Sequence, residues 1–234
     1  MTNGGGLLPI IALLPFLGAL IPGIMIRAGR NACAAFTAVP TIVALAMLAT
    51  MTPQVMAGEV LTAQITWLPQ LGLSASFFLD GLGLMFAFMI LGVGLLITLY
   101  ARFYLSGEDP MGQFYTYLLL FQGAMLGIVI SDNILLLLIF WELTSLSSFL
   151  LIGYWKHLPE GRQGARMALA VTGSGGLAMI AGTFVYGPLD RLLGTRKWVI
   201  FGGNLVAALV LGALILWPDR SLVLSVALLA LVGF

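Results

Sequence analysis

The residue with the clearest chemical potential is an acid inside a long apolar run. Glu142 stands in the sequence LLLLIFWELTS, near the middle of that run. A helix rises about 1.5 Å per residue, so the acid would lie near the centre of a bilayer that the run crosses. An ionised carboxylate there costs at least a few kcal/mol unless it is paired or hydrated. Burial therefore favours the protonated form, and Glu142 is a candidate step in a proton path.

Hydroxyl side chains follow the acid at helical spacing. Ser145 and Ser148 come at three-residue intervals after Glu142, on one side of the helix, and Thr144 and Ser147 add further hydroxyls. These groups are able to hold ordered water beside the acid. The alternative is structural: a neutral glutamic acid joins two helices, and the hydroxyls bond back to carbonyls of their own helix.

The composition indicates which elements must position this acid. The chain has 234 residues, of which 61% are hydrophobic and 8% charged, whereas ordinary globular domains carry about 25% charged residues. The net charge of +1 gives no field that would attract nucleic acid. Neither a phosphate-binding glycine loop nor a Cys/His metal spacing is present, so the sequence argues against a soluble enzyme and against a metal site.

We predict an all-α, polytopic transmembrane bundle of about eight spans, because each apolar run is long enough to cross a bilayer. Pro9, Pro15 and Pro22 predict a kinked first span. The predicted spans are Leu7–Ile26, Ala32–Met51, Phe77–Tyr100, Phe114–Ile130, Asn133–Tyr154, Met167–Tyr186, Trp198–Trp217, and Leu222 to the end.

The basic residues predict the orientation. Through five spans they lie only in the odd-numbered loops, which places those loops in the cytoplasm and the N-terminus outside, in a multi-pass protein of the bacterial inner-membrane type. The loop expected after the sixth span breaks the rule, because it carries Arg191, Arg196 and Lys197 on the side predicted to be external. The odd-loop cations are Arg27, Arg30, Arg102, Lys156, Arg162 and Arg166.

The longest loop, from Thr52 to about Ser76, contains β-prone residues and favours a short external hairpin. Asp80 follows it, where it is expected to cap the third span or, as the alternative, to touch an external entrance. Asp132 and Asn133 stand in a tight turn between spans four and five, where a helix start requires a cap.

Three segments carry a resemblance to a known family. TWLP at 66–69, FLDGLGL at 78–84 and FWELTSLSSFLLIGYW at 140–155 resemble the large antiporter-like subunits. These include the A subunit of the Mrp-type multisubunit Na⁺/H⁺ antiporter and the corresponding subunit of respiratory complex I. The run Gly164–Leu169 favours the Mrp type, and the resemblance covers about residues 1–182.

The resemblance implies proton or cation translocation by a transporter subunit, with Glu142 on the path. The implied partners are other membrane subunits and the lipid bilayer, with no cofactor and with H⁺ and, for the Mrp type, Na⁺ as transported ions. The alternatives are a subunit of the complex I type and a facilitator-type solute transporter fragment. In the family the glutamate works against a lysine on a later, interrupted helix. Here no lysine lies inside a later predicted span, and the chain is shorter than a family member.

The tail, residues 183–234, looks foreign to that family. The run Tyr186–Lys197 resembles the charged loop of major facilitator transporters, with one extra residue between Arg191 and Gly194. This resemblance implies a conformational clasp made of Asp190, Arg191, Arg196 and Lys197, and the alternative is an ordinary basic cytoplasmic loop. The resemblance also predicts a join near Gly182, through gene fusion or an error of sequence assembly, that divides the chain into 1–182 and 183–234.

Overall fold

The computed structural model describes residues 4–68 and 73–193, and side chains within 4–65 and 74–176. The chain divides into two units, Met1–Tyr154 and Trp155–Phe234. Among the described residues, five helical segments of the first unit are long and apolar enough to cross a membrane. The protein is therefore a multi-pass membrane protein. Predicted spans seven and eight lie outside the described residues.

The first span is irregular, as its prolines predicted. It consists of α1 (Leu8–Gly18), the short α2 (Ile21–Met25) and a 3₁₀ turn, η1 (Ile26–Ala28). Pro15 lies inside α1 and removes one helical hydrogen bond. The chain then turns at Gly29, whose positive φ of 104° an L-residue rarely adopts.

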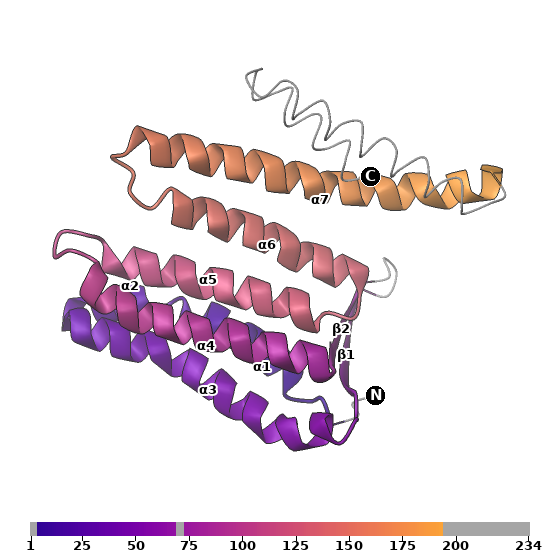
Figure 1. Ribbon diagram of the computed structural model, residues 1–234, viewed down its shortest axis with the longest axis horizontal. Coiled ribbons are helices and arrows are strands. Elements are labelled where there is room, and N and C mark those ends of the chain that lie inside the picture. Colours follow the sequence, from indigo (N-terminus) through magenta and orange to yellow (C-terminus); the bar gives the residue numbers. More distant parts are fainter. Residues whose placement is uncertain (1–3, 69–72, 194–234) are drawn as a thin grey trace. The chain divides into compact units, whose positions relative to one another are not determined.

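Four longer helices complete the first unit: α3 (Arg30–Met56), α4 (Gly81–Tyr104), α5 (Met111–Ile130) and α6 (Ile134–Ile152). They lie side by side in the order α3, α4, α5, α6, and α1 packs against both α3 and α5 (Figure 1). Buried side chains of α1, α3, α4, α5 and α6 form one apolar core. A smaller core, which includes Cys33, Met111, Tyr115 and Tyr154, lies toward the end where α6 finishes.

The expected hairpin forms, and it moves the start of the third span. Strands β1 (Leu61–Leu68) and β2 (Leu73–Leu79) pair antiparallel, with Leu61 opposite Leu79. Phe77 was predicted to begin the span but belongs to β2, because its side chain lies with that of Leu79 on the buried face of the hairpin. The helix begins only after Asp80, whose carboxylate accepts a hydrogen bond of 2.7 Å from the Gly83 amide.

The hairpin also holds the start of α6. Phe77 forms an isolated β-bridge with Ser131, and the Asp132 amide donates to the Ser76 carbonyl at 2.9 Å. The cap of α6 is Asn133, whose side-chain oxygen accepts from the Leu135 amide at 2.8 Å. Of the two cap candidates, Asp132 therefore contributes its backbone to the hairpin and Asn133 caps the helix.

The second unit begins with one long helix, α7 (Pro159–Leu193). It contains the predicted sixth span, Met167–Tyr186, and continues beyond it. The loop that was expected from Gly187 onward is therefore helical as far as Leu193. Leucine and arginine are good helix formers, and the run DRLL extends the helix past the predicted end.

Candidate functional site

The middle of α6 carries the predicted acid. Glu142 is partly buried, and its Oε1 atom is inaccessible to solvent and has no hydrogen-bond partner among the described residues. A buried polar atom without a partner costs roughly 1–3 kcal/mol, and more when it is charged. The carboxyl group is therefore poised between a neutral form and an ionised form that would need a partner or water.

The face of α6 that packs against the rest of the unit does not include this acid. Leu136 and Phe140 are buried in the main core, and Leu143 packs against it. Successive helical residues are rotated by about 100°, so Glu142 lies about 200° from Phe140. Within the first unit, α6 packs mainly against α5 and β2 and also meets α1 through the rings of Phe16 and Phe140, and none of these three elements contains Asp, Glu, Lys, Arg or His. No basic side chain of those elements is thus available to pair with Glu142.

The neighbouring hydroxyls bond to their own helix. The Trp141 carbonyl accepts from Thr144 at 2.6 Å and from Ser145 at 3.2 Å. Ser147 donates to the Leu143 carbonyl at 2.7 Å. Such bonding to the same helix is what the alternative, a purely structural role for these hydroxyls, predicted. Because each hydroxyl already donates its hydrogen, only its oxygen lone pairs are left to accept a hydrogen bond from another group. Ser148, one turn beyond Ser145, is partly exposed.

The remaining predicted site residues, those of the charged clasp, have no described side chains. Asp190 and Arg191 lie on the last two turns of α7, in the stretch whose side chains are not described. Arg196 and Lys197 lie outside the described residues. Within the described residues no group of three or more His, Cys, Asp or Glu side chains has a metal-binding arrangement.

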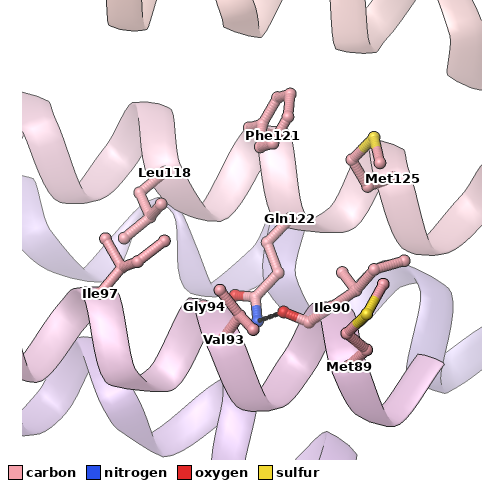
Figure 2. A pocket seen from close by; sticks show the side chains of 9 residues that line it. All are labelled: Met89, Ile90, Val93, Gly94, Ile97, Leu118, Phe121, Gln122 and Met125. Carbon is pink, nitrogen blue, oxygen red and sulfur yellow. Dashed lines mark hydrogen bonds between the residues drawn. The ribbon is translucent and has the colours of Figure 1, made fainter. Parts of the chain in front are cut away.

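A second polar group, which was not predicted from the sequence, lies inside the bundle. Gln122 of α5 is only 3% exposed, and its amide oxygen accepts from the Thr41 hydroxyl of α3 at 3.0 Å. Its amide nitrogen points toward α4, where the carbonyls of Ile90 and Leu91 lie 3.4 and 3.3 Å away (Figure 2). Gln122 thus connects three helices. An amide within the apolar run of residues 118–130 was the signal that could have revealed it.

A glycine makes room for this amide. A Cβ atom added to Gly94 of α4 would lie 2.4 Å from the Gln122 amide nitrogen, closer than a side chain tolerates. Further along the same helices, the Thr98 hydroxyl donates to the Gly94 carbonyl at 2.9 Å, and the Tyr115 hydroxyl donates to the Thr98 carbonyl at 2.9 Å. Buried polar side chains at a helix interface stabilise membrane bundles because hydrocarbon offers them no other partner.

Beside Gln122, a shallow groove runs along the surface between α4 and α5. It has a volume of about 240 Å³ and is lined by apolar side chains apart from this amide (Figure 2). Its chemistry is that of a hydrocarbon-facing surface, and it offers no group that would bind an ion.

Two family models match the chain. One, described as the N-terminus of chain 5 of NADH-ubiquinone oxidoreductase (complex I), matches residues 67–115. The other, described as the transmembrane region of the NADH:quinone oxidoreductase/Mrp antiporter family, matches residues 131–189, a segment that includes Glu142.

Curated relatives and a solved structure extend these matches. A probable K⁺/H⁺ antiporter A/B subunit of Rhizobium meliloti is 43% identical over 218 residues, covering 89% of this chain and 22% of the relative. The Na⁺/H⁺ antiporter A subunit of Bacillus subtilis is 48% identical over 178 residues, covering 75% of this chain and 22% of the relative. A chain of the Mrp complex from Dietzia sp. superposes with a TM-score of 0.64 at 31% identity, covering 75% of this chain and 19% of that one.

The family match and the relatives extend past the predicted join near Gly182. The second family match runs to residue 189, and α7 continues unbroken to Leu193. The Rhizobium alignment covers more of the chain than residues 1–182 make up. The division into 1–182 and 183–234 stays a prediction.

The chain spans about a fifth of the length of the curated relatives that it matches. The family models, these relatives and the solved complex all point to one group of proteins. The chain therefore belongs to the family of large antiporter-like membrane subunits that Mrp-type antiporters share with respiratory complex I.

Proposed function

We propose that the chain is a component of a multisubunit monovalent cation/proton antiporter, and that Glu142 is a group on its membrane-embedded proton path. The observation that supports this most directly is the buried carboxyl oxygen of Glu142, which has no hydrogen-bond partner among the described residues, in the middle of a membrane span. The span lies within the segment that the NADH:quinone oxidoreductase/Mrp antiporter model matches.

The physical basis is the cost of charge in the membrane. A carboxylate without a cation or water beside it is far less stable than a carboxylic acid, so loss of the proton requires a compensating group. In the proposed cycle the acid takes a proton from one side, and it releases the proton when a cation or water reaches it from the other. Thr144, Ser145 and Ser148 are proposed to line this path, where their oxygen atoms accept hydrogen bonds.

The transported ions are proposed to be H⁺ and one monovalent cation, without a bound cofactor. The relatives' names differ in that cation, which is K⁺ in one and Na⁺ in the other. The proposed partners are other membrane subunits of an antiporter complex in the cell membrane. No lysine lies on α7, the described helix that follows α6.

The test is transport by the chain co-expressed with its partner subunits in everted membrane vesicles. A fluorescent ΔpH probe reports proton movement after NaCl or KCl is added. We expect Glu142→Gln to abolish the response while the complex still assembles, because the amide cannot exchange a proton. The matched control is Glu108→Gln, which neutralises an exposed acid in the loop between α4 and α5 and should transport as the wild type does. Unchanged transport by Glu142→Gln, or no response of the wild type to either cation, contradicts the proposal.

A second candidate is a proton-pumping subunit of an NADH-quinone oxidoreductase, which the description of the model matched at residues 67–115 favours. The same vesicles distinguish the two functions. Acidification driven by NADH and independent of added Na⁺ or K⁺ supports the oxidoreductase. A facilitator-type solute transporter is suggested only by residues of the tail, and it stays a prediction.

A further inference from the structure

Helices α5 and α6 come close together where a glycine faces an aromatic ring. A Cβ atom added to Gly127 of α5 would lie 2.3 Å from Cδ1 of Phe140, and 2.4 and 2.5 Å from two further ring atoms. Only glycine fits at this position while the ring stays where it is. Phe140 is 7% exposed and belongs to the main apolar core, so the ring has little room to move.

A second aromatic ring packs against the same face of α5. Phe16 of α1 stacks on Phe140 with ring centroids 6.2 Å apart and planes inclined by 30°. Phe16 in turn lies against Gly123, where an added Cβ atom would approach its ring to 2.8 Å. Gly123 and Gly127 are one helical turn apart, so the two rings fill a single notch on α5.

The two ends of α6 are also held. At its start, Asn133 caps the helix, and its side-chain nitrogen donates to the Ser74 hydroxyl of the hairpin at 3.3 Å. Just beyond its end, the ring of Tyr154 packs edge-to-face on Phe114, with centroids 5.5 Å apart. Burial, reinforced by the charge of Asp109, raises the pKa of Tyr154 to about 12, so the phenol is neutral near pH 7. Phe140 lies between these two ends, so its contact with Gly127 bears on how the middle of α6 is rotated.

We infer that Phe140 is a positioning residue for Glu142: its ring, seated against Gly127, fixes the rotation of α6 and thereby the place of the carboxyl group two residues further on. The inference rests on the proposed role of Glu142 in proton transfer. A local rotation of the middle of α6 moves the side chains of Phe140 and Glu142 together, since they lie two residues apart on one helix. A displaced carboxyl group meets different surroundings, and the pH at which it exchanges its proton changes with them.

Within the first unit, the described elements packed against α6 offer no carboxylate, amine, guanidinium or imidazole group that would explain such a change. Of the elements of the first unit packed against α6, α1 and β2 have no titratable side chain, and those of α5 are Tyr115 and Tyr117, near the opposite end of α5 from its contact with the hairpin. Glu142 is itself the only acid or base on α6. A changed pH profile after a change at Gly127 therefore reports on Glu142.

The experiment measures transport against pH in the assembled complex for Gly127→Ala, for Phe140→Leu and for the two combined. In Gly127→Ala the added methyl group pushes the Phe140 ring away. We expect this change to lower the transport rate several-fold and to shift the pH of half-maximal transport by about half a unit or more. Phe140→Leu in the same chain makes room for the added methyl group and should return the pH of half-maximal transport toward the wild-type value. The matched control is Gly92→Ala on α4, where an added Cβ atom meets nothing within 4 Å.

The outcomes separate this inference from the proposed function. A Gly127→Ala complex that assembles and keeps the wild-type pH profile overturns the positioning role, while loss of transport in Glu142→Gln still supports the proton path. A shift that the double variant fails to reverse also overturns it. Full transport by Glu142→Gln rejects the proposed function, and the positioning role falls with it.

Discussion

Gln122 and Gly94 form a matched pair at the centre of the bundle. The amide needs hydrogen-bond partners because hydrocarbon surrounds the helices, and it finds them on α3 and α4. It reaches α4 only because residue 94 has no side chain. Each residue therefore explains the other, and neither takes part in the chemistry proposed for Glu142.

At this residue scale we expect Gly94→Ala to destabilise the protein by about 1–3 kcal/mol, because its methyl group overlaps the amide. The unfolding midpoint of the purified protein in detergent measures the effect. Combining it with Gln122→Ala should cost less than the sum of the two single changes, since the truncated side chain no longer meets the methyl group. Strictly additive losses would show that the two residues do not interact.

At the scale of the element, the hairpin links the starts of two spans. Strand β2 leads directly into α4 through the Asp80 cap, and the same strand bonds to the turn before α6. The hairpin thus fixes where these two helices begin relative to each other. This explains why α4 starts after the apolar run does: Phe77 and Leu79 are apolar because the hairpin's inner face is buried.

Asp80 tests the structural role of this junction. We expect Asp80→Ala to lower stability by about 1 kcal/mol, because the Gly83 amide loses its acceptor, and Asp80→Asn to be nearly neutral, because asparagine also caps helices. Both variants should transport at the wild-type rate per assembled complex. A stable Asp80→Asn variant without transport would instead place Asp80 at an ion entrance.

At the scale of the whole molecule, the charge distribution follows the fold of the first unit. Its three cations lie away from the hairpin: Arg27 is in η1, Arg30 begins α3 and Arg102 is in the last turn of α4, whereas the hairpin lies at the end where α4 begins (Figure 1). Arg30 donates to the carbonyls of Leu105 and Ser106, and Arg102 donates to the Asn31 side chain, so two of the three also tie the loops together.

The orientation of the unit is open to direct measurement. In a Cys33→Ala background, which has no other cysteine, a membrane-impermeant maleimide should label Gln64→Cys on the hairpin in intact cells. It should label Glu108→Cys only after permeabilisation, because cations collect on the cytoplasmic side. The unsubstituted background controls for non-specific labelling, and the opposite pattern would place the N-terminus inside.

The class of the protein, the positions of the first five spans within a few residues and the broken first helix all follow from the sequence alone, and the role of Glu142 stays a prediction. These follow from local quantities: apolar run length, proline, and the cost of one charge in hydrocarbon. The predicted span start at Phe77 was wrong, because an apolar run does not distinguish a buried strand from a helix, and the loop predicted to begin at Gly187 is helical as far as Leu193. Only the tertiary structure decided that Gln122 fits against Gly94 and Phe140 against Gly127. Such fits depend on which side chains from distant parts of the chain meet, and close packing sets them at distances that no spacing along the sequence encodes.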